Sequence, residues 1–321
     1  MKNTAASPSL ALGLGPLRLP NPVGVASGTF GYGGEYEELV DVDALGALYT
    51  KAVTLAPRPG NATPRIVETP AGMLNSIGLA NPGIDAFLAD KLPALRRRAC
   101  PVIVNVAGST EAEYLEVVER IEAAAGSWTP LPSASRTGVD GYEVNVSCPN
   151  VRHGGLAFGT DPAQVERLTR ALRDITKRCL VVKLTPNVAD IGAIAKAAEA
   201  GGADAISCIN TLVGMVIDVR SRRPMLAMGT GGLSGPAIRP VGVACVYKAS
   251  RAVRIPVVGL GGIMGPEDAL QYLLAGARAV QVGTGSFVDP GTALRVLAGI
   301  AAWMAERGVA RVEDIAGMLE A

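Results

Sequence analysis

The feature of this sequence that most constrains its fold is a regular alternation of short apolar segments with longer amphipathic ones. Most of the apolar segments are nearly continuous runs of Val, Ile, Leu, Ala and Gly, the pattern of parallel strands buried on both faces. Eight such strands joined by crossover helices predict an α/β fold, a (β/α)8 TIM barrel. The predicted strands are Val23–Ala26, Ala47–Ala52, Val102–Val106, Gly141–Val146, Leu180–Leu184, Ala205–Ile209, Val257–Gly259 and Ala279–Val282.

The amphipathic segments carry recognisable helix ends. Asp161 followed by Pro162 is an N-cap with proline in the first turn, and it predicts a helix that continues to about Lys177. The other predicted ends are a start at Gly265-Pro266 with a stop at Gly276, a start at Asp289-Pro290 for the helix that carries Trp303, and a stop at Gly201-Gly202 for a helix that begins near Val188.

The segment before the first strand, Leu10–Pro20, predicts a β-hairpin placed to close the barrel floor. The alternative fold is an open doubly wound sheet, which normally carries a glycine-rich phosphate fingerprint early in the chain. None is present there. Gly259–Gly265 resembles that fingerprint, but Met264 stands where its third glycine belongs.

The composition suits one large domain over residues 1–321, because barrels of this kind exceed the usual domain length and 49% of the residues are hydrophobic. No linker divides the chain. Ser127–Thr137 contains two prolines and no periodicity, so we expect a mobile surface loop there.

Charge and cysteine spacing exclude several classes of function. Lys and Arg number 30 against 29 Asp and Glu, so nothing indicates a nucleic-acid partner. The sequence shows no signal peptide and no apolar run near the ~18 residues of a membrane span, and we expect a cytoplasmic protein. The five cysteines form no CxxC pair, which argues against disulfides, a zinc site or an iron–sulfur cluster, and we expect no metal. We expect reduced, mostly buried thiols.

Polar residues gather where the predicted strands end, the side of a barrel that carries chemistry. Amides stand at Asn105, Asn145 and Asn210, and lysines lie within apolar strands at Lys51 and Lys183. A lysine is seldom buried without a partner, so an anionic ligand is the simplest explanation for both lysines. The glycines after the last two strands match the usual phosphate site of such barrels, although they also suit ordinary tight turns. Together these residues predict a phosphorylated cofactor.

Cys148 differs from the other cysteines because it follows a strand, precedes Pro149 and begins a glycine-rich loop. We expect this active-site loop to be mobile and the thiol to be exposed. His153, the only histidine, is best interpreted as a solvated loop residue. Without it no Ser-His-Asp triad can be assembled, which argues against a hydrolase.

Several motifs give the chain a family resemblance. They are NSIGLANPG (Asn75–Gly83), NVSCPN (Asn145–Asn150), INTLVGM (Ile209–Met215), GGLSGPAIRP (Gly231–Pro240) and VGLGGI (Val258–Ile263). From about Leu10 to about Gly308 the chain resembles dihydroorotate dehydrogenase, most closely the class 1B, NAD-linked catalytic subunit, in which a cysteine takes the place of the serine base of class 2.

The resemblance implies that the chain oxidises (S)-dihydroorotate to orotate in de novo pyrimidine biosynthesis. Cys148 would be the catalytic base, and FMN would accept the hydride. FMN would be held by Ser27, Lys51, Ala52, Asn105, Asn145, Lys183, Ile209, Gly235, Gly261, Gly262, Gly283 and Thr284. Dihydroorotate would be held by Lys51, Asn75, Ser76, Ile77, Gly78, Leu79, Asn145, Asn210 and Thr211. Electrons would pass to NAD through a partner subunit carrying FAD and a [2Fe–2S] cluster, with a homodimer core inside a heterotetramer.

Three other interpretations remain open. The chain could be a class 1A, fumarate-linked dihydroorotate dehydrogenase, or another FMN barrel such as a dihydropyrimidine or dihydrouridine reductase. A non-redox, phosphate-binding barrel is the third. A purely non-catalytic binding protein fits poorly with the lysines and amides at the strand ends.

Overall fold

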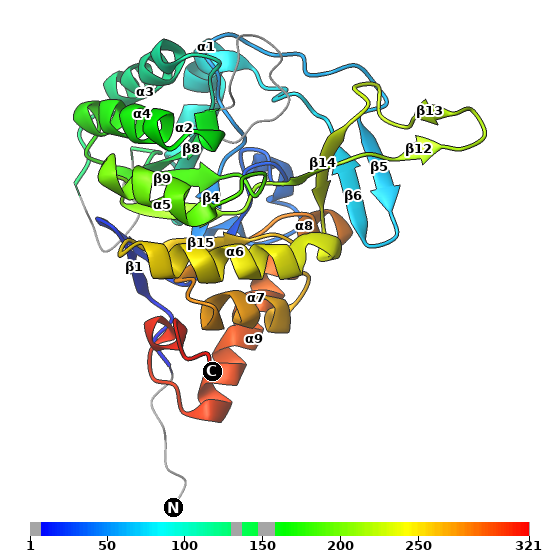
Figure 1. Cartoon of the computed structure of the whole chain (residues 1–321). Coiled ribbons are helices and arrows are strands. Elements are labelled where there is room, and N and C mark those ends of the chain that lie inside the picture. Colours follow the sequence, from blue (N-terminus) through cyan, green and yellow to red (C-terminus); the bar gives the residue numbers. More distant parts are fainter. Residues whose placement is uncertain (1–7, 130–136, 147–157, 321) are drawn as a thin grey trace, which may run out of the picture.

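A closed barrel of eight parallel strands forms the centre of the protein, which is described by a computed structural model over residues 8–129, 137–146 and 158–320 (Figure 1). Going round the barrel, each strand is hydrogen-bonded to the strand before and after it, and the last returns to the first. The strands are β3 (Val23–Val25), β4 (Ala47–Tyr49), β7 (Val102–Val106), β8 (Gly141–Asn145), β9 (Cys179–Leu184), β10 (Ala205–Cys208), β15 (Val257–Leu260) and β16 (Ala279–Val282). The predicted barrel is confirmed, and every predicted strand overlaps one of these.

Helices surround the barrel, and consecutive long helices pack against one another. The α-helices are α1 (Gly83–Ala86), α2 (Leu92–Leu95), α3 (Glu111–Ala125), α4 (Pro162–Ile175), α5 (Ile191–Ala200), α6 (Arg239–Ala252), α7 (Pro266–Leu274), α8 (Gly285–Val288) and α9 (Thr292–Arg307). A π-helix, η3 (Phe87–Lys91), joins α1 to α2. The connection from β3 to β4 contains only short 3-10 helices, η1 (Gly34–Tyr36) and η2 (Val42–Ala44). The remaining 3-10 helices are η4 (Phe158–Thr160), η5 (Pro236–Ile238) and η6 (Val312–Ile315).

Most of the predicted helix ends are confirmed. Asp161 caps α4 by accepting a hydrogen bond from the Ala163 amide at 2.9 Å. The predicted start at Asp289-Pro290 is early, because Asp289 ends the short α8 and α9 begins at Thr292.

The barrel floor is covered by the predicted hairpin, β1 (Leu12–Leu14) and β2 (Leu17–Leu19). Its alternate leucines are buried, and the Cys179 thiol at the start of β9 donates to the carbonyl of Leu14 at 3.3 Å. The turn needs Gly15, which has a φ of +59° and lies against Asp204, where a Cβ would come within 2.4 Å of the aspartate Cβ.

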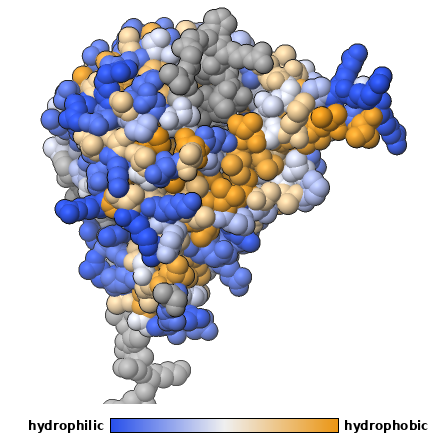
Figure 2. Space-filling view, viewed as in Figure 1, coloured by the Kyte–Doolittle hydropathy of each residue, from blue (hydrophilic) through white to orange (hydrophobic). Residues whose placement is uncertain are grey.

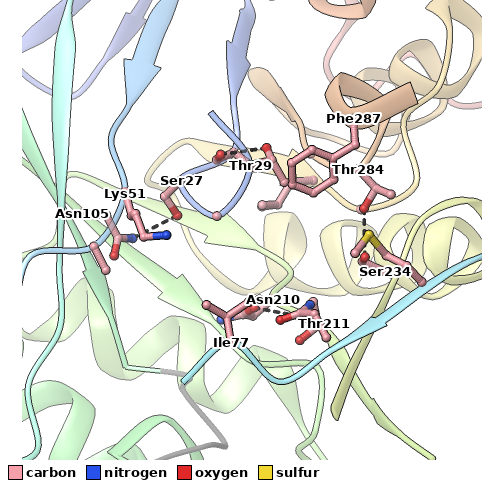
Figure 3. A pocket seen from close by; sticks show the side chains of 18 of the residues that line it. Ser27, Thr29, Lys51, Ile77, Asn105, Asn210, Thr211, Ser234, Thr284 and Phe287 are labelled. Carbon is pink, nitrogen blue, oxygen red and sulfur yellow. Dashed lines mark hydrogen bonds between the residues drawn. The ribbon is translucent and has the colours of Figure 1, made fainter. Parts of the chain in front are cut away.

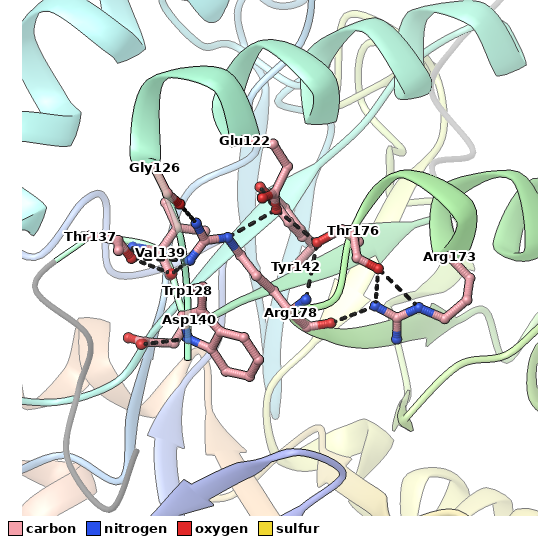
Figure 4. Close-up of polar contacts among 10 residues, drawn as sticks. All are labelled: Glu122, Gly126, Trp128, Thr137, Val139, Asp140, Tyr142, Arg173, Thr176 and Arg178. Atoms are coloured by element: carbon pink, nitrogen blue, oxygen red, sulfur yellow. Dashed lines mark hydrogen bonds and ion pairs between the residues drawn. The ribbon is translucent and has the colours of Figure 1, made fainter. Parts of the chain in front are cut away.

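A buried arginine also lies at the floor, just before β9. The Arg178 side chain is 1% exposed, and its Nε donates to Glu122 Oε1 on α3 at 2.9 Å (Figure 4). Its terminal nitrogens donate to the Gly126 carbonyl at 2.6 Å, to Thr137 Oγ1 at 3.0 Å and to the Val139 carbonyl. This set of contacts, the Arg178 clamp, fixes both ends of the segment predicted as a surface loop.

A second sheet, absent from the sequence prediction, lies at the other end of the barrel. Its antiparallel order is β11 (Leu212–Gly214), β14 (Gly231–Ser234), β6 (Gly72–Asn75) and β5 (Ile66–Thr69). Two strands come from the connection between β4 and β7, and two from the connection between β10 and β15. A hairpin arm, β12 (Ile217–Asp218) with β13 (Arg223–Pro224), projects from it (Figure 1). Apolar side chains cover parts of this arm and of the neighbouring surface (Figure 2).

Some predictions fall outside the part of the chain that the structure describes. They are the mobile active-site loop that begins at Cys148, the solvated position of His153, and the central part of Ser127–Thr137. Of the cysteines that are described, Cys100, Cys179 and Cys208 are buried, Cys245 is partly exposed, and none forms a disulfide. In the three described ranges, no helix is long and apolar enough to cross a membrane.

Candidate active site

A cavity of about 480 Å³ lies at the carboxyl ends of the barrel strands, between the barrel and the second sheet. Its walls include residues near or just after the carboxyl end of each barrel strand, together with Ile66, Met73, Asn75 and Ser234 from the sheet. Parallel strands direct their carboxyl ends to one edge, so segments far apart in the chain converge here.

All the residues predicted to hold a cofactor line this cavity. They are Ser27, Lys51, Ala52, Asn105, Asn145, Lys183, Ile209, Gly235, Gly261, Gly262, Gly283 and Thr284. The sequence argument about strand ends is therefore matched by their position in space, although their individual roles remain predictions.

The residues predicted to hold substrate also line the cavity, with the exception of Ser76. The lining members are Lys51, Asn75, Ile77, Gly78, Leu79, Asn145, Asn210 and Thr211. Ser76 is fully buried, and its amide donates to the Arg65 carbonyl at 2.8 Å. Cys148 lies outside the described residues.

Three buried side chains form one wall of the cavity. Lys183 Nζ and Asn105 Nδ2 each lie 3.3 Å from Ser27 Oγ, and both can donate to it. Ser27 and Asn105 are shown in Figure 3. Asn105 is fully buried, yet its Oδ1 has no hydrogen-bond partner among the described residues. A buried acceptor without a partner is costly, so this oxygen indicates where a ligand N–H would be favourable.

Lys183 has a protein counter-ion, which corrects the sequence argument for this residue. Its Nζ lies 3.5 Å from Glu143 Oε2 inside the barrel. The ammonium therefore requires no anionic ligand to be buried. Glu143 was missed, although a charged residue within a buried strand is the same signal that drew attention to the lysines.

Lys51 differs, since no carboxylate of the described chain lies within 4.0 Å of its ammonium. Partial burial lowers the pKa of Lys51, Arg65 lowers it further, and Glu35 opposes the shift. All three residues line the cavity. For Lys51, an anionic ligand remains the expected partner.

The other end of the cavity has main-chain donors suited to an anion. The N–H groups of Gly262, Gly283 and Thr284 donate to no acceptor in the part of the chain that is described. Gly262 has a φ of +71°, and a Cβ there would come within 2.7 Å of the Gly235 carbonyl oxygen, so only glycine fits easily. Thr284 Oγ1 donates to Ser234 Oγ at 2.8 Å, which joins the barrel to the second sheet (Figure 3).

Amides line the side nearest the second sheet. Asn210 Nδ2 donates to Asn145 Oδ1 at 3.3 Å, and Asn210 Oδ1 accepts from the Thr211 amide at 2.8 Å. Asn75 Nδ2 donates to the Gly232 carbonyl at 3.3 Å. Carboxamides present paired donors and acceptors, which match the amide edges of a small cyclic ligand.

Barrel and cavity together define an α/β-barrel enzyme whose ligand site lies at the carboxyl ends of its strands, with donors for an anion at one end and amides at the other. The family model described as dihydroorotate dehydrogenase matches residues 9–304, and the chain belongs to this family. Membership of the family implies a flavin cofactor.

Known proteins resemble the chain over nearly its full length. It is 52% identical over 313 residues to the dihydroorotate dehydrogenase B (NAD(+)) catalytic subunit of Pelobacter propionicus, and equally to that of Trichlorobacter lovleyi; each match covers 98% of this chain and 99% of the relative. A crystal structure of the dihydroorotate dehydrogenase of Eimeria tenella in complex with ferulenol has the same fold, with a TM-score of 0.79 and 22% identity over 99% of this chain and 90% of the other.

Proposed function

We propose that this chain oxidises (S)-dihydroorotate to orotate with bound FMN, in de novo pyrimidine biosynthesis. The observation that carries the proposal is the cavity itself, which combines a buried amide and lysine wall with main-chain donors at the far end. The names of relatives at 52% identity support the substrate.

The polar groups that line the cavity match those of FMN. The N–H groups of Gly262, Gly283 and Thr284 would hold the phosphate, in the position usual for barrels of this kind. The unpartnered Asn105 Oδ1 and the Lys183 ammonium would face the polar edge of the flavin ring system. The remaining predicted cofactor residues would line the same volume.

Dihydroorotate would occupy the amide side of the cavity, next to Lys51. Its carboxylate needs a cation, and Lys51 is the lining lysine that forms no ion pair with a carboxylate in the described part of the chain. The amides of Asn75, Asn145 and Asn210 would pair with the ring. Cys148, three residues after Asn145 in the sequence, would remove the C5 proton. When bound, FMN supplies the two-electron acceptor for the hydride that leaves C6.

The electron acceptor in this proposal is NAD, reached through a second subunit that carries FAD and a [2Fe–2S] cluster. The support is the name of the relatives, which are catalytic subunits of an NAD(+) enzyme. We propose a homodimer core within a heterotetramer, located in the cytoplasm. Val213, Ile217 and Val219 on the arm and its approach are 52%, 53% and 83% exposed, and a second copy of the chain would bury them.

The visible spectrum of the purified chain tests the proposal. We expect flavin absorbance, a spectral change on adding orotate, and bleaching by dihydroorotate. A colourless protein that cannot be reconstituted with FMN would instead favour the non-redox barrel. A flavoprotein bleached by a reduced nicotinamide but unresponsive to orotate would favour a dihydropyrimidine or dihydrouridine reductase. A preference for fumarate in a homodimer would favour class 1A.

A further inference from the structure

Glu143 lies inside the barrel and accepts hydrogen bonds from several strands at once. It is fully buried on β8. Its Oε2 accepts from Asn105 Nδ2 at 2.6 Å and lies 3.5 Å from Lys183 Nζ. Its Oε1 accepts from Ser207 Oγ at 2.9 Å and from Gln281 Nε2 at 3.0 Å. Both carboxylate oxygens are therefore occupied by donors from β7, β9, β10 and β16.

The carboxylate lies directly behind the cavity wall. Glu143 does not line the cavity, but its partners Asn105 and Lys183 do. A carboxylate only accepts, so the NH2 group of Asn105 must face Glu143. The Asn105 Oδ1 is thereby left as the acceptor that has no partner among the described residues. The orientation of Asn105 toward a ligand is set by Glu143.

The carboxylate is charged as well as fixed. Burial raises the pKa of Glu143, but the Lys183 ammonium and the hydrogen bonds from Gln281, Asn105 and Ser207 together outweigh burial, and the pKa lies below its ordinary value. The negative charge of Glu143, behind the cavity wall, and the positive charge of Lys183, in that wall, therefore compensate each other.

We propose that Glu143 is a positioning residue that orients Asn105 and Lys183 toward the flavin and, as the counter-charge of Lys183, lowers the reduction potential of the bound cofactor. The proposal rests on FMN filling the cavity as proposed above. Reduction brings negative charge to the flavin, and a compensated ammonium stabilises that charge less than a free one.

The variant Glu143→Gln tests the effect of the carboxylate charge separately from the effect of its hydrogen bonds. The glutamine oxygen can still accept from Asn105 and Lys183. The NH2 group of the new glutamine would face Ser207 and Gln281. The Ser207 hydroxyl can rotate so that it accepts instead of donating. The Gln281 side-chain amide can flip so that its Oε1, which has no partner among the described residues, accepts in place of its NH2 group. The shape of the site is kept while one buried negative charge is removed.

The test is a redox titration of the FMN-loaded chain across a range of pH. We expect the preference for reduced over oxidised FMN to be at least about tenfold greater in Glu143→Gln than in the wild type. For a two-electron couple, this corresponds to a reduction potential about 30 mV higher. We expect the potential of the variant to be the higher one at each pH of the titration.

The matched control is Glu122→Gln, which removes a carboxylate from the Arg178 clamp at the opposite end of the barrel. It should lower the melting temperature but leave the potential unchanged. A Glu143→Gln variant that loses stability and keeps the wild-type potential at every pH would overturn the proposal. A wild-type chain that binds no FMN would instead overturn the proposed function.

A second variant serves if Glu143→Gln does not fold. Glu143→Asp keeps the charge but withdraws it by one methylene from Asn105 and Lys183. We expect the dissociation constant of FMN from this variant to rise about tenfold, the effect of weakening a hydrogen bond to a charged group. The control is Glu122→Asp. An FMN dissociation constant equal in both variants would contradict the positioning role.

Discussion

Lys51 and Lys183 line the same cavity, yet their surroundings give them different chemistry. Lys183 is held by Glu143 and Ser27 in a fixed pair inside the barrel. Lys51 is only partly buried and shares the cavity mouth with Arg65 and Glu35. Lys183 therefore has a counter-ion within the protein, and Lys51 is available to bind an anionic ligand reversibly.

The lowered pKa of Lys51 predicts a pH dependence for orotate binding. A lysine is charged below its pKa, so orotate affinity should fall as pH rises through that value, earlier than for an ordinary lysine. Lys51→Gln should weaken binding by about tenfold to a hundredfold, the range for a hydrogen bond to a charged group, and remove this dependence. Spectral titration of the flavin with orotate measures both, and a wild-type pH profile in the variant would contradict the assignment.

Cys148→Ser should retain FMN and bind orotate but lose most activity at neutral pH, with partial recovery at high pH, because a hydroxyl ionises far less readily than a thiol. Steady-state rates with an artificial dye as acceptor measure this. Cys100→Ser is the control: burial raises the pKa of Cys100 to about 12, so this thiol is no base at neutral pH. Wild-type turnover in the Cys148 variant at neutral pH would rule out the proposed base.

At the scale of elements, the barrel could be predicted from sequence while the second sheet could not. Buried parallel strands are nearly continuous apolar runs such as Val257–Leu260, and this pattern can be read from the local sequence alone. The strands β5, β6, β11 and β14 are short and partly exposed, and all but β5 contain glycine. They pair only because two distant connections meet above the barrel. Glu143 was missed because its hydrogen-bond partners lie on four other strands.

The Arg178 clamp is the element-scale feature with the largest expected effect on stability. Arg178→Met removes the cation paired with Glu122 and the donor to two main-chain carbonyls, and breaking a buried pair in this way typically costs about 3–5 kcal/mol of the free energy of unfolding. Arg167→Met, which breaks the exposed Arg167–Glu111 pair, should cost no more than about 1 kcal/mol. Denaturant unfolding of both variants provides the comparison, and equal losses would show that the clamp contributes no more to stability than an exposed ion pair.

At the scale of the whole molecule, the chain lacks any evident route from a reduced cofactor to NAD. Its sequence contains no CxxC spacing for an iron–sulfur cluster, and Gly259–Gly265 lacks the third glycine of a dinucleotide fingerprint. Catalysis and onward electron transfer would therefore belong to different subunits.

The isolated chain should oxidise dihydroorotate with dyes or oxygen but reduce NAD poorly, and adding the partner subunit should restore NAD reduction. Parallel assays of NADH formation, by the near-ultraviolet absorbance of the reduced nicotinamide, and of dye reduction, by the visible absorbance of the dye, separate the two activities. Normal NAD reduction by an iron-free preparation of this chain alone would refute the two-subunit assignment.

The Arg178 clamp also has a use in protein engineering. It holds Gly126 and Thr137 in place at the barrel floor, on the side away from the cavity. Because both ends of the intervening segment are already anchored, lengthening it adds only a slowly growing closure entropy, about 0.6 kcal/mol for each doubling. A biotinylation peptide or an electrode-binding tag spliced between these ends would attach the enzyme to a surface by its floor, with the cavity mouth facing the solution.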